Sequence, residues 1–315
     1  FFSSFGQSYF LGLFNSSIRD ALSITHGQFG SIYASATLFS SLLLIWVGKK
    51  IDDVNIFKFA LFVIILLSFA CFFFSKVSSV FLLFIAIFLM RFSGQGMMSH
   101  TASTTISRYF TRTRGRALSI SWFGLSSAEF IMPVLMVYLL TITHWQNLWL
   151  IFSLTVLIVL PIASFLLIKN LNLDSREAND ENIKHVEIKQ WRRRDVLKDY
   201  RFYIISLNML AMPWIFTGFA VFQSFVQTSK GWGPYVIAQS FMSYSILSVL
   251  TLFLSGFLID KFTSRKLLIY MNIPLLFSVV VLYFFDTPGN CFVIYFASRY
   301  SPQKEMTGIN LLLSS

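Results

Sequence analysis

The chain has 315 residues, of which 56% are hydrophobic and only 12% are charged, and its mean hydropathy is +0.68. Soluble domains carry about 25% charged residues, so this composition excludes an ordinary soluble protein and indicates a chain built for lipid. The net charge of +11 does not imply a nucleic-acid partner, and we expect none, because the cations are spread over the loops of one membrane face.

Apolar runs of about 20 residues, the length that crosses a bilayer, recur along the whole chain. They do not alternate in polarity at every second residue, as the strands of a membrane barrel would. One run, Phe130–Ile168, is long enough for two crossings, and we expect it to turn at Thr143–Asn147. The sequence therefore predicts an all-α integral membrane protein with about ten spans, at residues 1–18, 28–47, 58–75, 79–106, 117–142, 147–168, 202–227, 235–259, 267–285 and 289–298.

The distribution of Lys and Arg over the loops predicts the orientation of these spans. Four alternate loops together hold 19 of these residues, whereas the opposite loops hold three, Arg19, Lys76 and Lys230. Loops rich in Lys and Arg stay in the cytoplasm. We therefore expect a multi-pass protein of the cell membrane with its N-terminus and its large central loop in the cytoplasm.

The only substantial polar stretch, Lys169–Arg201, predicts a linker between two helical units. The predicted domains are a six-helix bundle at 1–168, a cytoplasmic linker at 169–201, and a second bundle of about four helices at 202–315. The chain begins with Phe, and its second half has two fewer spans than its first. We therefore expect a fragment of a six-plus-six protein, which we also expect to be monomeric.

A short pattern occurs twice, 208 residues apart, each time at the cytoplasmic end of a predicted span. Gly48 precedes Asp52 by four residues, and Gly256 precedes Asp260 by four residues. Such an Asp can accept N–H groups at a helix start, and such a Gly permits close helix approach. Any charged turn between helices could look like this once, but two copies indicate duplicated halves, as in secondary transporters. In the first copy, we expect Asn55 to take a left-handed turn.

Arg91 and Glu129 are the only charged residues well inside predicted spans. A charge at the bilayer centre costs roughly 2.5 to 3.5 kcal/mol on insertion scales. Each lies about twelve residues into its span, which places both near the midplane on adjacent antiparallel helices. One interpretation is a structural ion pair. The other is a transport site, in which Arg91 binds a substrate anion and Glu129 carries a coupled proton.

Other polar residues inside spans are candidates for substrate contact or for hydrogen bonds between helices. They are Gln7, Tyr9, Gln95, Asn208, Gln223 and Gln239. Pro213 predicts a kinked or broken seventh span, and such helices flex in transporters. The four His residues are too scattered for one metal site, and we expect no cofactor or metal.

The repeated pattern resembles the loop motif of the major facilitator superfamily, Gly-x-x-x-Asp-Arg/Lys-x-Gly-Arg/Lys-Arg/Lys, which also has a degenerate second copy. The resemblance implies that Gly48, Asp52, Gly256 and Asp260 gate the cytoplasmic side. The first copy departs from the motif, because Asp53 replaces the cation, Asn55 replaces Gly, and Ile56 and Phe57 replace the basic pair.

Further segments are similar to that superfamily or to one branch of it. Arg91-Phe-Ser-Gly94-Gln-Gly96 is similar to the Arg/Gly pattern that the superfamily has in its fourth span. The Arg-rich segment Ser107–Ile120 resembles the entry to span five in monocarboxylate transporters and oxalate/formate antiporters. The resemblance implies a small organic anion as substrate. Two departures remain: the eighth span lacks a cation, and the fifth lacks the Gly-Pro pair of antiporters, which favours symport or uniport.

Other classes of function fit the sequence less well. No Gly-x-x-x-x-Gly-Lys-Ser/Thr loop exists for an ATP-driven pump, and an Arg–Glu pair alone is no catalytic set, so we expect no enzyme. The sequence predicts a secondary active transporter of a small solute, such as a monocarboxylate, with possible proton coupling. The alternatives are a carrier of a non-anionic solute, such as a sugar or a drug-like efflux substrate, and a non-transporting receptor or scaffold of the same fold.

Overall fold

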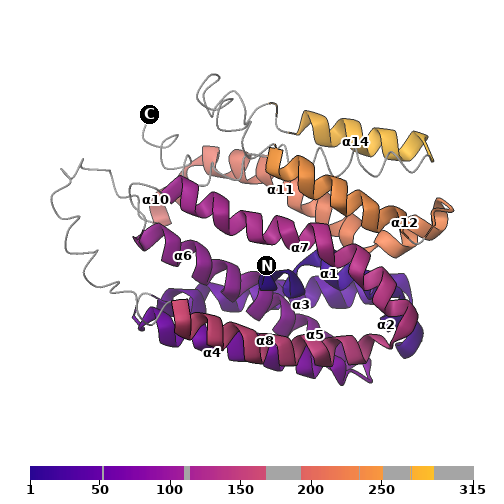
Figure 1. Ribbon diagram of the computed structural model, residues 1–315. Helices are drawn as coiled ribbons and strands as arrows, with labels where there is room; N and C mark the ends of the chain where they lie inside the picture. Colours follow the sequence, from indigo (N-terminus) through magenta and orange to yellow (C-terminus); the bar gives the residue numbers. More distant parts are fainter. Residues whose placement is uncertain are drawn as a thin grey trace.

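The computed structural model describes residues 1–51, 53–109, 114–167, 193–233, 235–250, 270 and 272–286. The regular elements in these ranges are all helices, which lie side by side along a common direction (Figure 1). In chain order they are η1 (Phe2–Gly6), α1 (Ser8–Leu13), α2 (Asn15–Leu22), α3 (His26–Val47), η2 (Gly48–Ile51), α4 (Ile56–Ser75), α5 (Val80–Met90), η3 (Arg91–Met98), α6 (Ser99–Tyr109), α7 (Arg114–Ile142), α8 (Trp145–Leu167), α10 (Arg193–Lys198), α11 (Tyr200–Val221), α12 (Gln223–Ser229), the unlabelled helix Val236–Leu250 and α14 (Ile273–Phe284).

Most predicted spans are confirmed where the structure describes them. Six helical stretches are long and apolar enough to cross a membrane, and their bounds differ from the predictions by a few residues. They are His26–Ile51, Ile56–Ser75, Val80–Ser107, Ala117–Ile142, Trp145–Leu166 and Tyr200–Val221. The predicted turn is also confirmed, because α7 ends at Ile142 and α8 begins at Trp145. The predicted span at 289–298 lies outside the described residues.

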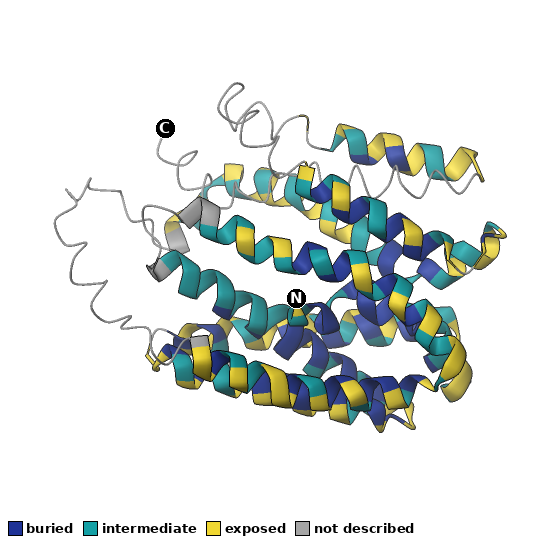
Figure 2. Ribbon diagram, in the orientation of Figure 1, coloured by how far each residue is buried: buried dark blue, intermediate teal, exposed yellow. Residues whose placement is uncertain are grey.

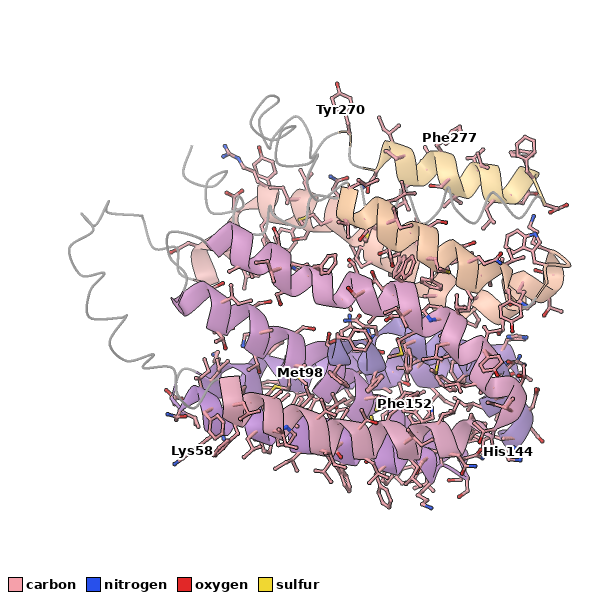
Figure 3. All side chains as sticks on the ribbon, in the orientation of Figure 1. Lys58, Met98, His144, Phe152, Tyr270 and Phe277 are labelled. Atoms are coloured by element: carbon pink, nitrogen blue, oxygen red, sulfur yellow. The ribbon has the colours of Figure 1, made fainter. Side chains whose placement is uncertain are left out.

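The bundle has two ends, and different helix termini lie at each of them. Lys58, near the start of α4, lies at one end, and His144, between α7 and α8, lies at the other (Figure 3). We call the first the linker end, because α8 stops there at Leu167 and α10 begins there at Arg193 (Figure 1). The opposite end is called the far end. The turns from α2 to α3 and from α4 to α5, and the helix α12, lie at the far end.

The first span is not one continuous helix, so the prediction for residues 1–18 is wrong in that respect. The 3-10 helix η1 ends at Gly6, and Gln7 is extended, with φ −79° and ψ 151°. Helix α1 then runs only to Leu13, and Phe14 separates it from α2. Ser and Gly are poor helix formers, and they cluster at Ser3-Ser4-Phe-Gly6-Gln-Ser8.

The seventh span is interrupted in a different place from the one that its proline suggests. Helix α11 continues through Pro213, so of the two predicted outcomes a break at that residue is wrong, and a kink there stays a prediction. The interruption comes at Phe222, which has φ −98° and ψ 17° and separates α11 from α12.

A cluster of aromatic side chains fills the centre of the N-terminal half. Trp149 of α8 is fully buried and packs against Phe10, Phe14 and Phe74, with ring centroids 4.5 to 5.6 Å apart. Many exposed side chains on the outer helices are large and apolar, including Phe62, Ile65 and Phe69 of α4 (Figure 2). An apolar outer surface around an aromatic interior suits a bundle surrounded by lipid.

Helices α4 and α8 are joined by a pair of serines on their shared face. The Ser68 hydroxyl donates to the carbonyl oxygen of Ser153 at 3.0 Å, and the Ser153 hydroxyl donates to that of Ser68 at 2.8 Å. Both side chains are buried. Small hydroxyl residues allow helices to approach closely in membranes. The two reciprocal bonds therefore show that α4 and α8 are closely packed at this point.

Candidate functional site around Arg91

Arg91 stabilises the break in the first span. Its Nη1 donates to the carbonyl oxygen of Gly6 at 3.0 Å and to the Ser8 hydroxyl at 3.2 Å. These two residues flank the extended Gln7. The Tyr33 ring of α3 lies under the guanidinium, 5.3 Å from its carbon, and the Tyr33 hydroxyl donates to Ser8. A charged donor thus satisfies a carbonyl near an interrupted helix, in a region where water is scarce.

The backbones of η1 and η3 come into direct contact at this break. A Cβ atom on Gly6 would lie 2.4 Å from the Met90 carbonyl oxygen, and one on Gly94 would lie 2.7 Å from the Gly6 nitrogen. Element η3, which carries Arg91, is a π-helix. π-Helical turns are rare in proteins, and those that occur often lie at functional sites. The close contact and the wide turn together place Arg91 over the Gly6–Ser8 break.

Arg91 bonds to the first span, and Glu129 lies on α7, which packs against η1 and α1. The two hydrogen bonds of Arg91 go to Gly6 and Ser8. Glu129 of α7 is buried and only 4% exposed. Both residues predicted near the midplane are therefore buried in the bundle, and their joint role as a transport site stays a prediction.

Several buried polar atoms beside the break have no hydrogen-bond partner among the described residues. These atoms are Nε of Arg91, the Tyr9 hydroxyl and Oε1 of Gln95. A buried polar atom without a partner costs about 1–3 kcal/mol. Such atoms are suited to bind a ligand, because a bound polar group would supply the missing partners.

The remaining candidate residues have different surroundings. Gln7 and Gln95 are partly buried, and Gln239 is exposed. The Asn272 side chain of α14 donates to both the backbone carbonyl and the side-chain oxygen of Asn208, at 2.8 and 2.7 Å. Gln223 is buried and donates to the Tyr9 carbonyl at 3.1 Å. Asn208 and Gln223 thus make the helix-to-helix bonds that the sequence offered as the alternative to substrate contact.

Only part of the predicted gating pattern lies within the described residues. Gly48 packs against His100 of α6, whose Nε2 is 3.0 Å from the Gly48 carbonyl oxygen. Asn55 is not left-handed, so that expectation is wrong. It has φ −53° and ψ 127°, and its side chain accepts from the N–H groups of Phe57 and Lys58 as the N-cap of α4. Asp52, Gly256 and Asp260 lie outside the described residues.

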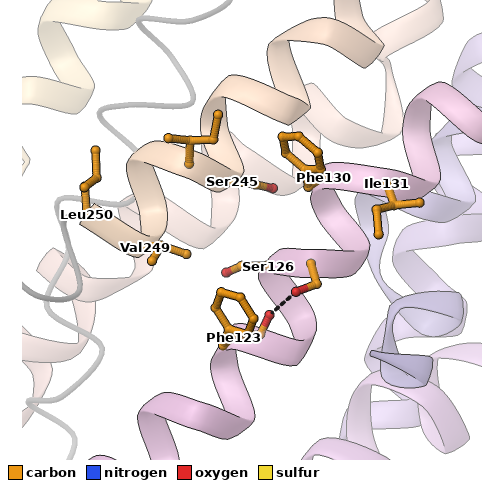
Figure 4. A pocket seen from close by; sticks show the side chains of 9 residues that line it. Phe123, Ser126, Phe130, Ile131, Ser245, Val249 and Leu250 are labelled. Atoms are coloured by element: carbon orange, nitrogen blue, oxygen red, sulfur yellow. Dashed lines mark hydrogen bonds between the residues drawn. The ribbon is translucent and has the colours of Figure 1, made fainter.

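An apolar cavity lies between α7 and the helix Val236–Leu250. Its volume is about 370 Å³. Phe123 and Ser126 of α7 face Ser245 and Val249 of the other helix across it (Figure 4). The Ser126 and Ser248 hydroxyls lie 3.0 Å apart and join the same two helices. The described lining has no charged residue, which suits an apolar or amphipathic molecule.

Comparison with known proteins identifies the family. The model of the Major Facilitator Superfamily matches residues 1–300. The chain belongs to this superfamily. It is therefore a multi-pass membrane protein of a secondary-transporter family, as the repeated Gly–Asp pattern indicated. No curated protein sequence matches it.

A solved structure shows the same fold. It is the crystal structure of a bacterial homologue of the human lysosomal transporter Spinster, in an inward-facing and occupied conformation. The TM-score is 0.70 at 15% sequence identity, and the match covers 99% of this chain and 75% of the other. The predicted major-facilitator-type helical bundle is thereby confirmed.

Sequence reasoning missed four residues whose side chains join separate elements of the bundle. Ser8 and Tyr33 hold Arg91, Asn15 bonds to the second half of the chain, and Asn272 bonds to Asn208. Three of them are polar residues within or beside apolar runs, which is a usable signal. Tyr33 gave no such signal in the sequence, because aromatic residues are common in membrane spans.

Proposed function

We propose that the chain is an alternating-access carrier of a small organic anion, such as a monocarboxylate, bound at the break in the first span. The observation that carries this is the buried Arg91, whose Nε has no partner among the described residues while its Nη1 holds the break. The Tyr9 hydroxyl is a second buried polar atom in the first span without a hydrogen-bond partner among the described residues. Planar guanidinium groups suit carboxylates, which accept two parallel hydrogen bonds.

Glu129 is proposed to couple transport to protons. It is buried on α7, which packs against α1, the helix that carries Tyr9. Protonation of Glu129 would lower the local negative charge and so favour binding of the anion. The anion and the proton would therefore cross the membrane together. This gives symport, in agreement with the missing Gly-Pro pair in the fifth span.

The orientation and the inner gate follow from the loop charges. The loops predicted to be cytoplasmic hold 19 Lys and Arg residues and include the linker, so we propose that the linker end and the N-terminus face the cytoplasm. Gly48 and, from outside the described residues, Asp52, Gly256 and Asp260 are proposed to gate this side. The moving parts would then be two helical units, at 1–168 and 202–315, which the linker at 169–201 joins.

A second candidate is a carrier of an apolar or drug-like solute. The cavity between α7 and Val236–Leu250 favours it, because the described lining consists of apolar side chains and serine hydroxyls. In this case Arg91 would have a purely structural role at the break.

A ligand screen separates the two candidates, because a bound ligand raises the apparent melting temperature. Small organic acids, sugars and apolar drug-like compounds are compared on the full-length protein and on Arg91→Lys. The anion proposal predicts that an organic acid stabilises the wild type and that Arg91→Lys loses most of this shift. Stabilisation by apolar compounds only, equal in both proteins, would favour the second candidate.

A further inference from the structure

The first and seventh spans are interrupted at equivalent positions. Phe14 separates α1 from α2 with φ −95° and ψ 0°, and Phe222 separates α11 from α12 with φ −98° and ψ 17°. The two residues are 208 positions apart, which is also the spacing of Gly48 and Gly256. The internal repeat therefore extends from the gating pattern to these interruptions, where both halves adopt nearly the same backbone conformation.

The residue after each interruption carries an amide side chain that bonds to the opposite half. Asn15 Nδ2 donates to the Val221 carbonyl oxygen at 2.6 Å, and Gln223 Nε2 donates to that of Tyr9 at 3.1 Å. Val221 is the last residue of α11, and carbonyls in the last turn of a helix lack partners within that helix. The two donors are 208 positions apart, like the interruptions, whereas the acceptors do not correspond, because Leu13 is the position equivalent to Val221. Each half thus donates one amide bond to the other half.

The orientation of Asn15 is fixed by a neighbour. Arg19 Nε donates to Asn15 Oδ1 at 2.7 Å, one turn further along α2. Because this oxygen accepts from Arg19, the amide nitrogen must be the group that faces Val221. Asn15 and Gln223 are 0% and 2% exposed, so each bond is shielded from water.

Close packing surrounds the two bonds. A Cβ atom on Gly12 would lie 1.9 Å from the Ala220 carbonyl oxygen, so the backbones of α1 and α11 touch. The Phe222 ring lies against Gly30 of α3, where a Cβ atom would be 2.5 Å from its edge. His26 of α3 and Phe225 of α12 are in edge contact at 5.0 Å. Helices α2 and α12, which begin with Asn15 and Gln223, lie at the far end, opposite the linker (Figure 1).

We propose that Asn15 and Gln223 form a reciprocal latch that holds the two halves together at the far end. Opening of that end would break both bonds and expose both amides and both carbonyls to water. We expect each bond to favour the closed far end roughly 5-fold, because a buried hydrogen bond is worth about 1 kcal/mol net. The inference rests on alternating access in this family and is independent of the cargo.

Distances between spin labels across the far end test the latch without any substrate. The labels are placed at exposed Ser31 of α3 and Ser229 of α12, in full-length protein in lipid nanodiscs with Cys71 and Cys291 replaced. The latch is removed with the near-isosteric pair Asn15→Leu and Gln223→Met. The matched control is Asn272→Leu, which removes a similar amide–carbonyl bond within the C-terminal half.

The wild type and Asn272→Leu are expected to show mainly the short distance of the closed far end. The double variant is expected to raise the ratio of long to short distances roughly 25-fold, and Gln223→Met alone roughly 5-fold. The single variant keeps the Asn15 bond and serves as the test if the double variant does not fold. An unchanged distribution in folded latch variants, or an equal shift in Asn272→Leu, would overturn the latch.

Discussion

Gly6 and Gly94 touch backbone to backbone where the first span crosses the fourth. A Cβ atom on Gly6 would lie 2.8 Å from the Gly94 Cα, and one on Gly94 would lie 2.8 Å from the Gly6 Cα. This contact brings the π-helical η3 close enough for Arg91 to reach the carbonyl oxygen of Gly6. The arrangement of the candidate site therefore depends on two residues that have no side chains.

Replacement of Gly94 by Ala should disrupt this crossing. The added methyl group would meet rigid backbone atoms, and overpacking of this kind costs about 1–3 kcal/mol. We expect a lower apparent melting temperature in detergent and loss of any ligand-induced shift. Gly218→Ala is the control, because nothing lies within 4 Å of its Cβ position in α11. Equal stability of Gly94→Ala and Gly218→Ala would contradict the close contact.

Arg91→Met should destabilise the protein more than Arg91→Lys. Methionine leaves the buried Gly6 carbonyl without its donor from Arg91, at a cost of about 1–3 kcal/mol, whereas Ser8 keeps the Tyr33 hydroxyl as a donor. Lysine can still donate to Gly6, but it lacks the planar fork that suits a carboxylate. Melting temperatures and anion titrations of both variants measure the two effects separately. A fully stable Arg91→Met variant would show that the break does not need this cation.

Asn55→Ala should weaken the start of α4. It removes the side chain that accepts from the N–H groups of Phe57 and Lys58, and loss of such a cap costs about 0.5–2 kcal/mol. Asn55→Asp keeps the acceptor and serves as the control. Thermal unfolding of the two variants should differ by this amount, whereas identical curves would exclude a capping role.

The serine pair between α4 and α8 should show coupling in a double-mutant cycle. Ser68→Ala and Ser153→Ala each remove one reciprocal bond, and such bonds in membranes average about 0.6 kcal/mol. The two hydroxyls also lie 3.2 Å apart, so the effects should not be additive. Strictly additive losses would mean that the serines act independently.

Most of the bundle could be predicted from the sequence, because apolar runs mark the segments that cross the membrane and charged loops mark their ends. The helices around Arg91 were predicted at nearly their observed bounds, and the Gly–Asp repeat led to the right superfamily. The break at Gln7 could not be predicted from apolarity, since its stability depends on a guanidinium 84 positions away. The break expected at Pro213 did not occur, because neighbouring helices can support a proline inside a continuous membrane helix.

The central claim is that an organic anion is bound by Arg91 and moved together with a proton held by Glu129. The most direct test is uptake of labelled small monocarboxylates into proteoliposomes that contain the full-length protein under an imposed pH gradient. We expect accumulation above the external concentration in the wild type and equilibration without accumulation in Glu129→Gln. No flux of any anion in the wild type, or undiminished accumulation in Glu129→Gln, would contradict the claim.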